Sequence, residues 1–143
     1  MVDVQSMKDE RQIPLQKVGV KGVRYPIVLK DKSAQVQHTT AVVNLYADLP
    51  HDFKGTHMSR FIEVFEQYRS DLSMPRFLKM LESIRTQLKA ETAYSDLHFP
   101  YFIQKAAPVT GQVAMMSYDC SYEGMVSSTQ RRFVVGVSVR VQT

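Results

Sequence analysis

A short segment at residues 53–61, FKGTHMSRF, gathers side chains that could hold an anion. Its cations, its histidine and its hydroxyl group lie within seven residues, at Lys54, His57, Ser59 and Arg60. Free backbone N–H groups at a helix start favour an anion, and Lys and Arg side chains bind phosphate through charge-assisted hydrogen bonds. A capped helix start with solvated charges explains the same residues equally well. The residues alone leave both interpretations open.

Other chemistries have weaker support in the sequence. The four histidines, His38, His51, His57 and His98, do not stand at a metal-ligand spacing such as HxxxH, and CxxC is absent. We therefore expect no metal site from the residues alone. Cys120 has no adjacent histidine and lies in an alternating segment, so we expect a small buried hydrophobe rather than a nucleophile. The Gly-rich phosphate loops GxxxxGK[ST] and GxGxxG do not occur.

Composition limits the class of protein. The chain has 143 residues, a formal net charge of +4 and 44% hydrophobic residues, which suits one domain with a real core. The charge is spread along the chain, so binding of nucleic acid is not expected, although Tyr101, Phe102 and Lys105 come nearest to a base-stacking platform. The sequence has no apolar run of 18 residues, no hydrophobic signal core and a single cysteine, so we expect a cytoplasmic protein without membrane contact.

Hydrophobic periodicity predicts the elements that position these residues. Residues 18–29 and 39–49 are extended segments, and the second alternates apolar and polar side chains as a half-buried strand does. A loop is expected at residues 31–35. Apolar residues then recur at helical spacing from Phe61 to Leu72, and Ser73 with Pro75 predicts the start of a second helix that continues to Leu88.

Strand character returns after Tyr94 and continues in three segments. Residues 97–104, 112–122 and 132–142 read as strands, and residues 123–130 are expected to form a loop. The order β-β-α-α-β-β-β favours an α+β domain, in which two consecutive helices pack on one face of an antiparallel sheet. We divide the chain into a polar N-terminal arm at residues 1–16 and a single folded unit at residues 17–143.

Several motifs in this order resemble a known family. They are KDER at 8–11, VGVKGVRYPI at 18–27, HTTAVVNLYADLP at 38–50 and FKGTHMSRFIEV at 53–64. Together they closely resemble the prokaryotic type IB GTP cyclohydrolases, along nearly the whole chain. The resemblance implies the tunnelling fold, a homotetramer, and hydrolysis of GTP to formate and 7,8-dihydroneopterin triphosphate at the start of folate biosynthesis. It also implies a divalent metal, zinc, manganese or iron, that activates water.

The chain departs from that family in its length. The metal ligands of the family are expected beyond Thr143, so the resemblance implies the N-terminal half only, without catalytic or metal-binding residues and without activity on its own. The resemblance implies that the substrate is bound by Lys54, His57, Ser59 and Arg60. Lys105, at the end of a strand, is expected to contribute to the same site. Arg60 and Lys105 are expected to neutralise the triphosphate, and His57 and Ser59 to position it. The alternative is a non-catalytic module of the same fold that serves interaction and assembly.

Overall fold

The computed structural model describes residues 14–30, 35–50 and 58–139. Five strands and two helices follow one another as β1 (Leu15–Lys30), β2 (Val36–Pro50), α1 (Met58–Tyr68), α2 (Met74–Gln87), β3 (Thr92–Ala106), β4 (Val113–Ser127) and β5 (Arg131–Ser138). All neighbouring strands pair antiparallel, and their order in the sheet is their order in the chain. The predicted α+β class and element order are confirmed. Of the loop expected at 31–35, residues 31–34 lie outside the described part.

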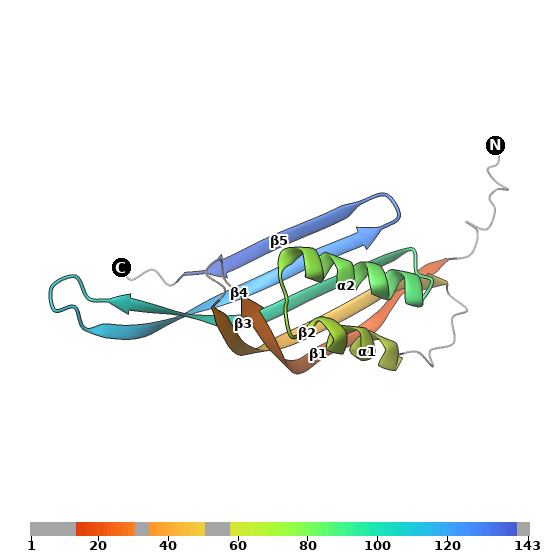
Figure 1. Ribbon diagram of the computed structural model, residues 1–143. Helices are drawn as coiled ribbons and strands as arrows, with labels where there is room; N and C mark the ends of the chain where they lie inside the picture. The colour runs from red at the N-terminus through yellow and green to blue at the C-terminus, as the bar shows by residue number, and fades with distance from the viewer. Residues whose placement is uncertain (1–13, 31–34, 51–57, 140–143) are drawn as a thin grey trace.

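Both helices lie on the same face of the sheet (Figure 1), and the core fills the space between the two layers. The alternation predicted for β2 is confirmed, because every second residue is fully buried, from Ala41 to Leu49. From the helices, Phe61, Phe65, Phe77 and Leu81 meet these strand residues and are also fully buried. Burying such side chains contributes about 1.5–3 kcal/mol each, so this interface supplies much of the driving force for folding.

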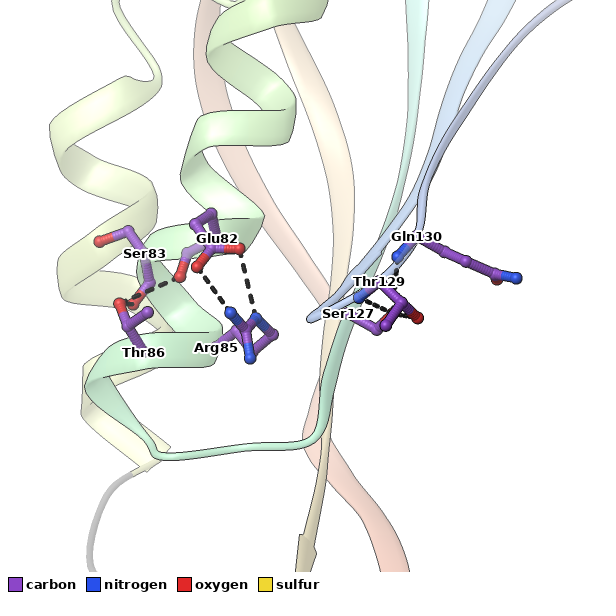
Figure 2. Close-up of polar contacts among 7 residues, drawn as sticks. All are labelled: Glu82, Ser83, Arg85, Thr86, Ser127, Thr129 and Gln130. Carbon is purple, nitrogen blue, oxygen red and sulfur yellow. Dashed lines mark hydrogen bonds and ion pairs between the residues drawn. The ribbon is translucent and has the colours of Figure 1, made fainter.

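Local signals in the sequence fix where α2 begins. The Ser73 hydroxyl accepts a hydrogen bond from the backbone N–H of Arg76 at 3.4 Å, and a proline stands in the first turn, as predicted. Near the other end, the guanidinium of Arg85 donates to both carboxylate oxygens of Glu82, at 3.2 and 2.9 Å (Figure 2). This hydrogen bonding is the main cause that raises the pKa of Arg85.

The prediction of a loop at residues 123–130 is wrong for residues 123–127, which belong to β4. β4 continues to Ser127, and a short turn joins it to β5, where the Ser127 hydroxyl accepts hydrogen bonds from the backbone N–H groups of Thr129 and Gln130 (Figure 2). The cluster of small and polar residues was misread as a loop, although Gly124 has a packing role. A Cβ at Gly124 would lie 2.5 Å from a ring carbon of Phe77, so the glycine lets α2 approach the sheet.

The sheet extends beyond its helical cover. The ends of β3 and β4 form a long hairpin that projects past both helices (Figure 1). Apolar side chains are exposed there and on β5, with Ile103 at 39%, Met115 at 64% and Val137 at 57% exposure. The burial of β5 does not alternate as predicted, because Val134 is exposed as well as Val135 and Val137 on the opposite face, and nothing in the described part of the chain covers these side chains.

Candidate functional site

The start of α1 carries the described part of the predicted anion site. Ser59 and Arg60 stand in its first turn with exposed side chains. That turn contains no acidic residue, so nothing within it offsets the partial positive charge of the helix start or the charge of Arg60. Lys54 and His57 lie outside the described residues, so the structure does not test how they are arranged around Arg60.

Lys105 stands at the other end of the molecule. The residue that follows α1, Arg69, accepts a hydrogen bond at 2.8 Å from the N–H of Val28 at the far end of β1, which fixes the direction of the helix. Its start therefore lies towards the end of β2, whereas Lys105 pairs with Ala114 in the projecting hairpin (Figure 1). The fold brings Ser59 and Arg60 together and keeps Lys105 away from them within one chain.

The helix-free face of the sheet carries a polar cluster that the sequence did not single out. The ammonium group of Lys17 lies 4.0 Å from the ring centre of Tyr94, whose hydroxyl donates to Asp48 at 2.5 Å. Partial burial, with the Asp48 hydrogen bond as the second cause, raises the pKa of Tyr94 to about 12. Tyr94 therefore stays protonated at neutral pH and acts as a hydrogen-bond donor to the carboxylate.

A second polar arrangement on this face ends at His98. The Asn44 side chain accepts from the N–H of Gly22 at 2.7 Å and donates to Asp96 at 2.6 Å. Asp96 Oδ1 in turn lies 3.3 Å from Nε2 of His98. The signal for this arrangement is the polar half of the alternation in β2 and β3, which a search for spaced motifs along the chain does not find.

Metal chemistry finds no support in the described residues. Within residues 14–30, 35–50 and 58–139, no group of three or more His, Cys, Asp and Glu side chains could hold a metal ion. The donor set needed for the divalent metal that the resemblance implies is therefore not found there. Cys120 is partly buried, and burial, with Asp119 as a lesser cause, raises the pKa of its thiol. A raised pKa opposes thiolate formation, which agrees with the structural role predicted for this residue.

Across the described part of the chain, no helix combines the length and apolar character needed to cross a membrane.

Comparison with known proteins identifies the family. The family model described as type I GTP cyclohydrolase folE2 matches residues 1–143. A protein from Syntrophus aciditrophicus named GTP cyclohydrolase FolE2 is 50% identical over 143 residues, which are all of this chain and 56% of that protein. A protein of the same name from Geobacter sulfurreducens is 48% identical over 99% of this chain and 54% of its own length. The chain thus spans little more than half the length of these relatives.

These matches correct the family drawn from the motifs. The assignment to type IB enzymes with the tunnelling fold is wrong, because the matching model and the relatives are those of FolE2. That assignment rested on a few short motifs, whereas the family model matches residues 1–143. The chain belongs to the FolE2 family of type I GTP cyclohydrolases.

Proposed function

We propose that this chain contributes the GTP-binding part of a GTP cyclohydrolase, which hydrolyses GTP to formate and 7,8-dihydroneopterin triphosphate at the start of folate biosynthesis. The observation that carries the proposal is the segment at residues 53–61, which lies within a family match that covers the chain. Relatives at 45–50% identity bear the name GTP cyclohydrolase FolE2. We further propose that residues 17–143 form one folded unit after an N-terminal arm.

The proposed roles follow from charge and position. Arg60 and Lys54 neutralise charge on the triphosphate, and the exposed first turn of α1 adds its free backbone N–H groups. His57 and Ser59 donate hydrogen bonds that position the phosphates. Cations that bind oxygen anions in this way use charge-assisted hydrogen bonds, which are about twice as strong as neutral ones.

Kinetics of the Arg60→Ala variant test this assignment. In a protein of the family's full length that carries this sequence, we expect KM for GTP to rise about tenfold or more, because one charge-assisted hydrogen bond to the triphosphate is worth about 1.5–3 kcal/mol. Formate release measures the rate. Lys79→Ala is the matched control, since Lys79 is an exposed cation on α2 away from the start of α1. An unchanged KM in Arg60→Ala, or an equal rise in Lys79→Ala, would remove Arg60 from the site.

We propose that the divalent metal of the reaction binds outside the described residues, which provide no group of three or more His, Cys, Asp and Glu side chains that could hold it. We propose zinc, manganese or iron for the complete protein. Metal content, measured on this chain and on the complete protein, should be stoichiometric in the complete protein alone.

A non-catalytic assembly module is the second candidate. The observation that favours it is the row of exposed apolar side chains on β5 and on the projecting hairpin, which suits contact with another protein surface. Formate release separates the two candidates. GTP-dependent formate release by the complete protein supports the enzyme. If the complete, metal-loaded protein assembles without releasing formate, the module is the better description.

A further inference from the structure

The helix-free face of the sheet contains two hollows that lie apart from the proposed GTP site. One, beside Lys17, has a volume of about 280 Å³, and the other, beside His98, has a volume of about 640 Å³. The larger hollow is lined by polar side chains from all five strands, among them Arg24, Thr40, His98, Ser121 and Ser138. The proposed GTP site at the start of α1 contributes no residue to it.

Strand register places the principal groups of this hollow in one row. Arg24 pairs with Val42, Val42 pairs with His98, and His98 pairs with Ser121. Side chains at paired positions of neighbouring strands point to the same face, about 4.5–5.5 Å apart at Cβ. The imidazole and the Ser121 hydroxyl are therefore direct neighbours on this face, and the Arg24 guanidinium stands on the far side of the small apolar side chain of Val42.

A chain of polar contacts from β1 to β3 orients the His98 imidazole. A bulge in β1 between Val20 and Val23 contains Gly22 at φ +72°, a conformation that favours glycine, and the Gly22 N–H donates to Asn44. Asn44 donates to Asp96, which lies 3.3 Å from Nε2 of His98. This contact leaves Nδ1 of His98 without a protein partner among the described residues. The arrangement orients a histidine that is 58% exposed in its side chain, which a purely structural contact would not need.

The Ser121 hydroxyl lies close to the backbone of β5. Ser121 pairs with Gly136 on β5, and a Cβ at Gly136 would lie 2.5 Å from the Ser121 hydroxyl. Any larger residue would push that hydroxyl away from its place. Two sets of groups thus face the hollow: donors at Arg24, His98 and Ser121, and one acceptor, the carboxylate of Asp119.

We propose that this hollow is a binding site for a small phosphate ester that carries hydroxyl groups, such as a sugar phosphate. The phosphate lies between Arg24 and His98, where the guanidinium donates to its oxygens and the imidazole contacts it through the ring nitrogen that Asp96 leaves free. The Ser121 hydroxyl donates a further hydrogen bond. Asp119 accepts a hydrogen bond from a ligand hydroxyl, which distinguishes an ester with hydroxyl groups from free phosphate.

Nuclear magnetic resonance of the labelled 143-residue chain tests the proposal. Ribose 5-phosphate is titrated, and the ring signals of His98 are assigned by their loss in His98→Gln. We expect a saturable shift of the His98 signals, about tenfold weaker binding in Arg24→Ala, and about tenfold weaker binding of inorganic phosphate than of ribose 5-phosphate. Equal affinities for the two probes would overturn the proposed ligand class.

Two further variants keep the test independent of folding and of the GTP site. Gly136→Ala adds one methyl group at the exposed edge strand and should weaken ribose 5-phosphate binding while the amide spectrum stays folded. Arg60→Ala should leave this binding unchanged, because Arg60 does not line the hollow. The proposal fails if the His98 signals do not respond, or if Arg24→Ala binds as tightly as the unaltered chain. A loss of binding in Arg60→Ala would assign the ligand to the GTP site instead.

Discussion

At the scale of single residues, the two faces of the sheet differ in chemistry. The helix-covered face is apolar at nearly every position, whereas the opposite face carries two sets of polar contacts. Lys17, Tyr94 and Asp48 form one set, and Asp96 and His98 belong to the other. The sequence predicted the apolar side well, because burial enforces a strict period of two. It did not predict the polar contacts, because their partners stand about 50 residues apart in the chain.

Titration of Tyr94 follows from one of these contacts. Because the folded state raises its pKa from 10 to about 12, the folded state holds this proton more tightly than the unfolded state does. The resulting stabilisation is complete below pH 10 and is lost as the pH rises from 10 to about 12. In Tyr94→Phe, we expect the free energy of unfolding to fall less steeply over this interval, as measured by urea denaturation at several pH values.

The tyrosinate absorbance of the same variant provides the control. Tyr94→Phe should remove one group that ionises near pH 12 and leave the titration of the other tyrosines unchanged. If the lost signal ionises near pH 10 instead, neither burial nor the hydrogen bond to Asp48 raises the pKa of Tyr94. Asp48→Asn should lower the pKa of Tyr94 without removing its signal, since the amide lacks the carboxylate charge.

At the scale of elements, sequence signals placed both helices and four of the five strands well. Ser73 and Pro75 marked the start of α2, and the apolar positions Phe77, Leu81 and Ile84 are buried as their spacing predicts. The missed part was the second half of β4. Glycine and serine there look like loop residues, but Gly124 is required by the close approach of α2, a tertiary cause that local propensity does not contain.

Packing of α2 on β4 can be tested at Gly124. Gly124→Val should lower the free energy of unfolding by about 1–3 kcal/mol, because its side chain must displace Phe77 and Leu81 in a filled core. Chemical denaturation followed by circular dichroism measures the change. Ala114→Val places the same side chain at an exposed position of the same strand and should change stability by less than about 0.5 kcal/mol. Equal effects of the two substitutions would contradict the close approach.

At the scale of the whole molecule, the location of Lys105 requires a second chain if it is to share a site with Arg60. The start of α1 and the projecting hairpin lie at different ends of the sheet (Figure 1). Hairpins of this kind, with exposed apolar side chains, reach neighbouring molecules readily. We propose that Lys105 of one chain completes the GTP site of another chain in a homo-oligomer.

Mixing two variants of the complete protein tests this arrangement. Arg60→Ala and Lys105→Ala should each lose most GTP cyclohydrolase activity, since each removes a cation from every site. After co-refolding in equal amounts, about a quarter of the sites should combine an intact Arg60 with an intact Lys105, and formate release should recover accordingly. Recovery is not expected when two Arg60→Ala samples are mixed. If the mixed variants show no more activity than the separate ones, the two cations do not meet across chains.

The sequence predicted the fold class correctly, but it did not predict how the candidate GTP-binding residues are distributed over the fold. Periodicity is a local property, so it predicted which residues of α1 and β3 face the core. Whether Arg60 and Lys105 meet depends on the direction of α1 along the sheet, which the contacts between Arg69 and Val28 fix. The family name came from similarity along the entire chain rather than from the motif alone.

The most direct test of the central claim is a titration of the 143-residue chain with GTP, followed by amide chemical shifts. The start of α1 should bind the triphosphate, so the amides of Met58, Ser59 and Arg60 should shift saturably with GTP and far less with guanosine. Arg60→Ala should weaken the response, and Lys79→Ala should not. Equal responses to GTP and guanosine, or shifts that avoid the first turn of α1, would contradict the claim that this segment holds the triphosphate.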